Sequence, residues 1–202
     1  MLTLTFRAAK MARACLRSYE KFAKFKGGAT EWGIDKPFPL LEVLDNNGLH
    51  DALWALHYCR PKTERNRIAR LFACDCSERA LPSFEKQYPE DKRPRLTIEV
   101  ARRFTNGMAT SAELAAAQEA AYAAVCQASY YAAVCQASYG TVHEIAYEAA
   151  YAAYSAVYLA GHQAFYSAFY SAIYPAVQSV HSAAYEAEKK WQEKHFREMI
   201  SE

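Results

Sequence analysis

Six charged residues between positions 75 and 102 are the side chains best suited to chemistry or to binding. Paired carboxylates can perform acid–base catalysis, but no His, Ser or Cys lies at a spacing that would define a catalytic set with them. Arginine guanidinium groups can bind phosphate or another small anion. Charged side chains of neighbouring helices can equally pair with one another. We therefore expect no catalytic residue and no enzyme activity. The six are Asp75, Glu78, Arg79, Arg95, Glu99 and Arg102, and all except Glu99 are candidate binding residues.

Histidine and cysteine give little indication of a metal site. His143, His162 and His181 recur every 19 residues, which favours a layer of buried structural histidines over metal ligands. Cys74 and Cys76 would point about 200° apart on a helix, which argues against shared ligation of a metal ion. We expect no metal and no cofactor, and we keep His143 and His162 among the candidate binding residues. The six cysteines are expected to be reduced thiols.

Residues 110–185 form a stretch rich in Ala, Tyr and Ser. This stretch and the rest of the chain must position each other. Alanine is the strongest helix former, and no proline interrupts residues 110–173. Thr110 and Glu113 have the spacing of a capping box, which begins a helix. Gly140, Gly161 and Pro175 divide the stretch. The predicted helices are residues 111–139, 142–160, 162–174 and 176–199.

A tandem duplication lies inside this stretch, where residues 122–130 are followed by an identical copy, residues 131–139. Nine residues rotate a helix by about 180° relative to whole turns, so the two copies face opposite sides. One tyrosine-rich copy must then be exposed, contact another chain or be absorbed by a bend. Tyrosine is well suited to interfaces, so we predict a homodimer. The tyrosines at the ends of the copies are candidate binding residues: Tyr122, Tyr130, Tyr131 and Tyr139.

Charge and hydropathy restrict the partners. Residues 149–185 carry no Asp, Glu, Lys or Arg, and their length would suffice for a membrane span. Leu, Ile, Val and Phe are sparse there, however, and polar residues recur through the middle, so we expect no membrane partner. The net charge of +2 gives no reason to expect a nucleic-acid polymer as partner. Residues 1–6 are too short and polar for a secretory signal, so we expect a cytoplasmic protein.

Shorter helices are predicted before the alanine-rich stretch. Residues 6–25 form a basic amphipathic helix, which serves as a covering helix or as a surface for anions. Two helices follow at residues 39–46 and 49–59. A kinked helix runs from Arg67 through Pro82 to Tyr88, and Pro94 begins a helix that ends at Gly107.

We predict an all-α fold from this pattern. It is a helical bundle built on long, antiparallel, Ala/Tyr-rich helices and covered by the shorter N-terminal helices. We expect one domain over residues 1–202. Its parts are the N-terminal covering helices (1–60), a charged helical hairpin (61–107) and the Ala/Tyr-rich array (110–200).

Three motifs in the middle of the chain resemble the Imm5-like immunity protein family. They are Phe72-Ala-Cys-Asp-Cys-Ser-Glu-Arg-Ala-Leu-Pro82, Phe84-Glu-Lys-Gln-Tyr-Pro-Glu-Asp-Lys-Arg-Pro-Arg95 and Ile98-Glu-Val-Ala-Arg-Arg-Phe-Thr-Asn-Gly107. The alanine-rich array and the segment Ala187-Glu-Lys-Lys-Trp-Gln-Glu-Lys-His195 also look like this family. The resemblance covers about residues 67–200. It implies an all-α, alanine-rich protein of bacterial or phage origin that acts in conflicts between toxins and immunity.

Our leading functional hypothesis is a non-enzymatic, immunity-like binding protein that neutralises a toxin or another effector by steric blockade. An exposed tyrosine-rich face would then contact the protein partner. The alternative is a phage-encoded anti-defence sponge, in which Arg79, Arg95 or Arg102 pairs with a nucleotide or another small anionic ligand. A structural assembly protein is a third hypothesis.

Overall fold

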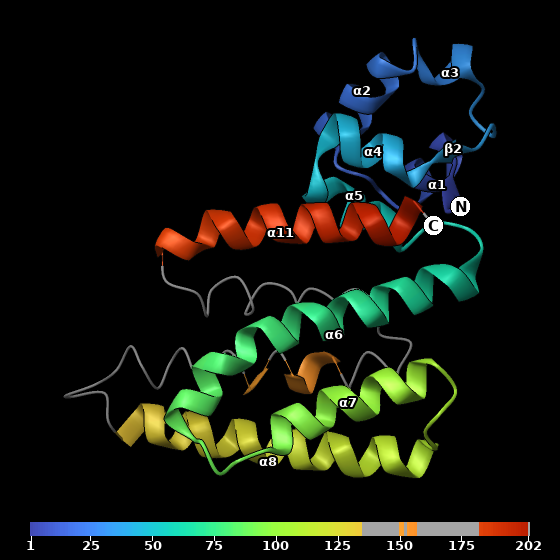
Figure 1. Ribbon diagram of the computed structural model, residues 1–202. Helices are drawn as coiled ribbons and strands as arrows, with labels where there is room; N and C mark the ends of the chain where they lie inside the picture. The colour runs from blue at the N-terminus through green and yellow to red at the C-terminus, as the bar shows by residue number, and fades with distance from the viewer. Residues whose placement is uncertain (135–149, 152, 157–181, 202) are drawn as a thin grey trace. The chain divides into compact units, whose positions relative to one another are not determined.

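The computed structural model describes residues 1–134, 150–151, 153–156 and 182–201 (Figure 1). The chain forms two compact units. The first unit is Met1–Ala69 with Trp191–Glu202, and the second unit is Arg70–Lys190. Helices dominate the described residues, which contain only one two-stranded sheet, so the all-α class is confirmed. The single domain and the covering role of the N-terminal helices stay predictions.

The first unit is assembled from short elements. They are β1 (Thr3–Leu4), α1 (Phe6–Met11), α2 (Leu16–Phe25), α3 (Ala29–Trp32), β2 (Phe38–Pro39), α4 (Leu40–Asn47) and α5 (Leu49–Leu56). The strands β1 and β2 pair antiparallel, with Leu4 opposite Phe38. The rings of Phe6, Phe22 and Phe38 form the centre of the core, with centroids 4.7–5.8 Å apart. The chain therefore closes a small aromatic core between elements that lie up to 32 residues apart.

The prediction of one basic helix over residues 6–25 is wrong, because α1 and α2 are separate helices. The chain turns between them at Arg13, which has a φ of 57°. On a continuous helix, Phe6 and Phe22 would be about 24 Å apart. Their ring centroids are instead 5.8 Å apart. The turn allows both phenylalanines to enter one core, and the burial of two aromatic rings outweighs the loss of a longer helix.

The next two helices lie close to the positions predicted from the sequence. The helix α4 ends at Asn47, and Gly48 follows with a φ of 94°, a conformation that glycine adopts without strain. The helix α5 ends at Leu56, three residues before the predicted end at Cys59. The released segment returns to β1, where Thr3 and Arg60 exchange backbone hydrogen bonds of 3.0 and 2.8 Å.

Longer helices make up the second unit. They are α6 (Lys62–Gln87), α7 (Arg93–Thr105), α8 (Ser111–Val134) and α11 (Ser182–Ser201), and α6 and α11 each contribute residues to both units. The helix α6 continues through Pro82 as predicted, although it begins five residues earlier than expected. Pro94 lies in the first turn of α7, and Gly107 follows the helix with a φ of 73°. These three predictions are confirmed.

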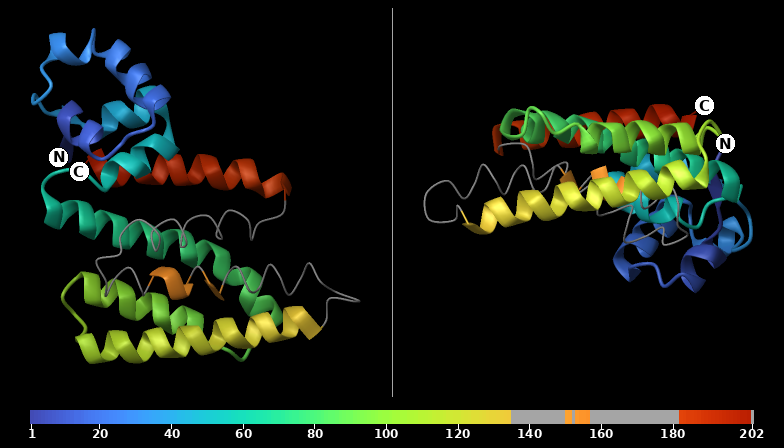
Figure 2. Two further views of the ribbon diagram at one scale, coloured as in Figure 1. Left: turned by 180° about the vertical axis from the view of Figure 1, so that it is seen from behind. Right: turned by 90° about the horizontal axis from the view of Figure 1, so that it is seen from below.

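The capping box at the start of α8 is also confirmed. The amide of Glu113 donates to Thr110 Oγ1 at 3.2 Å, and the amide of Thr110 donates to Glu113 Oε2 at 2.7 Å. The helices α7 and α8 lie side by side in both views of Figure 2. Thr97 Oγ1 joins them by donating to the carbonyl of Ala117 at 3.1 Å.

The array is described only in part. The helix α8 passes from Tyr130 to Tyr131, the junction of the two repeat copies, without interruption. The second copy beyond Val134 and the predicted helix of residues 162–174 lie outside the described residues, and of residues 142–160 only 150–151 and 153–156 are described, as helix. No helix among the described residues has the length and apolar character that a membrane crossing requires.

Candidate functional site

Charged residues of the three sequence motifs form ion pairs between α6 and α7. Arg102 Nη2 lies 2.6 Å from Asp75 Oδ1 and 2.5 Å from Glu78 Oε2. Arg95 makes a bidentate contact with Glu85, through Nε at 2.6 Å and Nη2 at 2.8 Å. Arg95 Nη1 also lies 3.8 Å from Glu78 Oε1, so Glu78 is shared by both arginines. The three motifs therefore come together as one charged network.

A further ion pair joins α6 to α11 within the second unit. Arg79 Nε donates to Glu188 Oε2 at 2.8 Å, and Glu188 is almost completely buried, with 3% of its surface exposed. A buried carboxylate without a cation would be costly, so this pair fixes α11 relative to α6 at that point. Glu188 was not among the sequence candidates, because a single Glu on a charged helix carries no signal of burial.

These pairings favour the structural interpretation of the charged motifs. The guanidinium groups of Arg79, Arg95 and Arg102 each already contact a carboxylate. The hydrogen bonds from Arg95 lower the pKa of Glu85, which stabilises the ionised form. A phosphate ligand would have to compete with those carboxylates, and the anion-binding role of these arginines stays a prediction.

The thiols of the first motif are buried. Cys74 and Cys76 both have no exposed surface, and burial raises the pKa of Cys74 to about 12. Thiols with such a pKa stay protonated near neutral pH, and a protonated thiol is a poor nucleophile and metal ligand. No cluster of three potential metal ligands occurs in the described part of the chain.

Tyr122 is the one tyrosine candidate whose side chain is described. It is 57% exposed, and its ring centroid lies 5.7 Å from that of Tyr154. Tyr130 and Tyr131 lie in α8, whereas Tyr139, His143 and His162 lie outside the described residues. The structure therefore places Tyr122 at the surface and leaves the other array candidates as predictions.

The outer surface of α8 has few charges. Of its ten exposed residues between positions 111 and 128, only Glu113 and Glu119 are charged. We call this surface the α8 face, and its uncharged members are Ser111, Ala112, Ala115, Ala116, Tyr122, Ala123, Cys126 and Gln127. In α11, six of the eight exposed residues between positions 186 and 201 are charged, which is usual for a solvated helix. The α8 face therefore differs from an ordinary solvent-facing surface.

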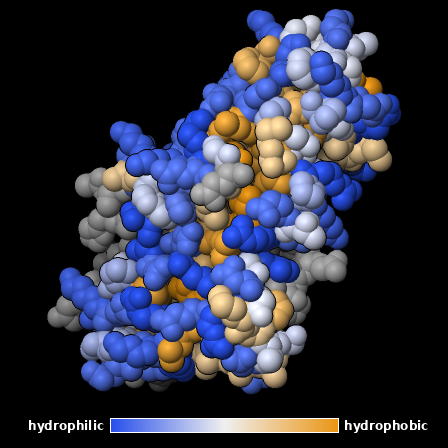
Figure 3. All heavy atoms as spheres, turned by 45° about the vertical axis from the view of Figure 1, so that its right-hand side comes forward, coloured by the Kyte–Doolittle hydropathy of each residue, from blue (hydrophilic) through white to orange (hydrophobic). Residues whose placement is uncertain are grey.

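A shallow apolar groove of about 280 Å³ lies between α7 and α8, beside the α8 face. Leu96, Val100 and Ala116 line it, and Leu96 is 55% exposed. Figure 3 shows how apolar side chains are exposed between hydrophilic ones on one side of the molecule. The sequence predicted the helices but not this groove, because alanine fits both buried and exposed helix positions and its pattern does not identify the outer side.

A family model described as "Imm-5 like putative immunity protein" matches residues 60–199. The match contains α6, α7 and α8, and so the ion pairs, the α8 face and the groove. It agrees with the resemblance seen over residues 67–200, which is thereby confirmed. Comparisons with the curated proteins and with the solved structures gave no significant match.

Proposed function

Since the chain belongs to the family of Imm-5 like immunity proteins, we propose that it binds a toxin or another effector and neutralises it by steric blockade. The proposal has two parts. The family supports a protein partner, and the composition of the α8 face supports the location of the contact. The blockade requires no reaction, only that the bound partner cannot reach its own target.

The observation that carries the proposal is the low charge of the α8 face. Charged residues are depleted at the cores of protein interfaces, because a charge that loses water without gaining a partner is costly. The exposed alanines allow a partner helix or loop to approach the backbone closely. Tyr122 and Leu96 offer larger apolar areas on the same hairpin, and such side chains often contribute most of the binding free energy.

The ion-pair network supports this division of roles. Arg95 and Arg102 hold α7 against α6 through Glu85 and Asp75. The helix α7 in turn holds α8 through the hydrogen bond from Thr97. The charged motifs thus position the hairpin, and the alanine-rich helix presents the surface.

The test is to introduce a charged, bulky side chain into the α8 face. Ala123→Arg is suited to this, because Ala123 is exposed and arginine is a good helix former. We expect the wild-type protein to retain a partner from its native host, and Ala123→Arg to weaken that binding by about a hundredfold, or about 2.7 kcal/mol. The melting temperature should not change.

The matched control is Ala187→Arg, the same substitution at an exposed alanine of the charged helix α11. It should bind the partner like the wild type. The captured protein should also be toxic when expressed alone and harmless when co-expressed with the wild type, but not with Ala123→Arg. If Ala123→Arg binds and protects normally, the α8 face is not the contact surface.

The predicted homodimer can be examined with the same variants. Light scattering at micromolar concentration should show a dimer, as predicted from the opposite orientation of the two repeat copies. Dissociation of that dimer by Ala123→Arg alone would assign the α8 face to self-association, whereas a wild-type monomer would contradict the dimer prediction.

A further inference from the structure

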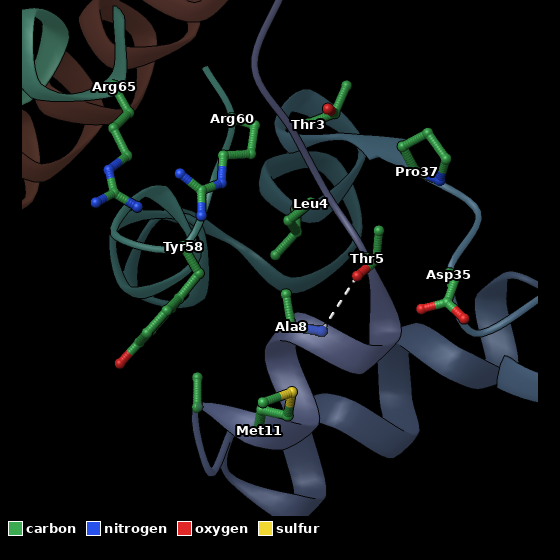
Figure 4. Close-up of a pocket in the computed structure, with 11 residues that line it drawn as sticks. Thr3, Leu4, Thr5, Ala8, Met11, Asp35, Pro37, Tyr58, Arg60 and Arg65 are labelled. Carbon is green, nitrogen blue, oxygen red and sulfur yellow. Dashed lines mark hydrogen bonds between the residues drawn. The ribbon is translucent and has the colours of Figure 1, made fainter. Parts of the chain in front are cut away.

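A shallow, open pocket of about 620 Å³ lies within the first unit, and none of its lining residues belongs to the α8 face (Figure 4). Three separate segments line it, residues 3–12, 35–37 and 58–65. Leu4, Ala8 and Met11 give it a largely apolar surface, and Tyr58 extends along one side. Its volume is in the range of pockets that hold small organic molecules.

The walls of this pocket are held in place by main-chain contacts. The paired amides and carbonyls of Thr3 and Arg60 fix the wall between β1 and the segment after α5. Thr5 Oγ1 accepts from the amide of Ala8 at 3.1 Å and so fixes the start of α1. The pocket is therefore formed before any ligand arrives, which lowers the entropic cost of binding.

Two arginines lie on the same wall of the pocket, and their guanidinium groups lie near each other in Figure 4. Arg65 is anchored by the carbonyls of His57 and Cys59. The side chain of Arg60 makes no hydrogen bond or ion pair with the described residues. Burial, and then the charge of Arg60, lowers the pKa of Arg65, as expected for two cations without a shared anion.

The carboxylate in the pocket lining does not compensate these charges. Asp35 is paired with Arg7, whose Nη2 donates to Asp35 Oδ2 at 2.7 Å, and it lies on the far side of the pocket from Arg65 in Figure 4. Residues 1–69 as a whole contain twelve Lys or Arg and seven Asp or Glu. Local and regional charge both favour an anion at the wall formed by Arg60 and Arg65.

We propose that this pocket binds a small organic anion. A phosphate or carboxylate group pairs with Arg60 and Arg65, and a flat apolar body lies over Leu4, Ala8 and Tyr58. Guanidinium groups bind both kinds of anion through paired hydrogen bonds, and aromatic rings stack on flat ligands. The site is independent of the proposed partner-binding function, because only residues 60–65 of its lining fall in the range matched by the immunity family.

Two fluorescent probes with the same aromatic body test the anion requirement. They are 8-anilinonaphthalene-1-sulfonate, which is an anion, and N-phenyl-1-naphthylamine, which lacks the sulfonate. We expect the sulfonate to bind once per chain. Arg60→Gln should weaken its binding about tenfold and leave the neutral probe unaffected. The matched control Arg17→Gln removes the same charge from an exposed position of α2 and should change neither affinity.

A second variant and two competitors complete the test. Ala8→Phe should fill the pocket without changing its charge, so both probes should bind more weakly. Phenyl phosphate or benzoate should displace the sulfonate probe, and because both carry one phenyl ring, the stronger competitor identifies phosphate or carboxylate as the preferred group. The proposal is overturned if Arg60→Gln and Arg17→Gln have equal effects, if Ala8→Phe leaves both affinities unchanged, or if neither competitor displaces the probe.

Discussion

The described cysteines fall into two groups by exposure. Cys15 and Cys126 are exposed, whereas Cys59, Cys74 and Cys76 are buried. Hydrogen bonds from the backbone of Ser18 and Arg17 lower the pKa of Cys15, and burial raises the pKa of Cys59 and of Cys74 to about 12. Exposure and a lowered pKa both favour the reaction of Cys15 with an alkylating reagent, whereas burial and a raised pKa both protect Cys59 and Cys74.

We predict that iodoacetamide at neutral pH modifies the exposed Cys15 and Cys126 in the folded protein. The three buried thiols should react only after denaturation. Peptide mapping by mass spectrometry at increasing times gives the rate at each cysteine. Alkylation of Cys74 or Cys76 in the folded protein at a rate like that of Cys15 would show that the second unit opens readily near α6.

The bidentate contact between Glu85 and Arg95 predicts a dependence of stability on pH. The pKa of Glu85 is lowered in the folded state, so its contribution is fully present above the pKa of an unfolded glutamate, about 4.3. It is lost as the pH falls through the lower, folded value. We expect Glu85→Gln to lose about 0.5–1 kcal/mol at pH 7 and to show a weaker loss of stability in acid.

Urea denaturation at pH 7 and at steps below pH 5 provides the measurement. The control is Glu90→Gln, which removes a similar charge from an exposed residue of the turn after α6. If both variants lose stability in acid as steeply as the wild type, the ion pair does not contribute measurably.

Among the helices, α8 has the most specific start signal, and its capping box can be tested directly. Thr110 Oγ1 accepts from the amide of Glu113, one of the amides that the helix itself cannot satisfy. Thr110→Ala should lower the free energy of unfolding by about 1 kcal/mol, while Thr110→Ser, which keeps the hydroxyl group, should lose much less. Urea denaturation followed by circular dichroism distinguishes them, and equal losses would show that the hydroxyl is not the relevant group.

Elements with a local signal were predictable from the sequence. The capping box, Pro94, Gly107 and the Pro82-containing helix act through the backbone of their own few residues, so they are visible without knowledge of the fold. The break at Arg13 was not predictable. It has no Gly or Pro, and its cause is the burial of Phe6 and Phe22 in one core. The two-residue strands are likewise too short for any periodic pattern.

The candidate sites were likewise predictable only where the signal is local. The charged motif residues were identifiable by type, but their pairing with Glu85 and Glu188 depends on which helices are neighbours. The α8 face is a property of exposure, and alanine does not signal exposure. The pocket near Arg60 joins three segments that are distant in the chain, so no motif contains it.

At the scale of the whole molecule, charge is unevenly divided. Residues 1–69 have a net charge of +5, from twelve basic and seven acidic side chains, although the chain as a whole has only +2. The net charge of the whole chain therefore does not reveal that its N-terminal part is basic. This part contains the proposed anion pocket. An argument from net charge alone against anionic ligands holds for extended polymers but not for a small ligand in that pocket.

The division into two units leads to the last prediction. The first unit contains residues 191–202, and Phe196 among them has no exposed surface. Phe196→Ala would leave a cavity and should cost about 3–4 kcal/mol, while Lys194→Ala at an exposed position of the same helix should cost little. Hydrogen exchange measured by mass spectrometry should rise mainly in residues 1–69 if that unit unfolds by itself. An equal rise in residues 70–128 would instead support one cooperative domain, as the sequence predicts.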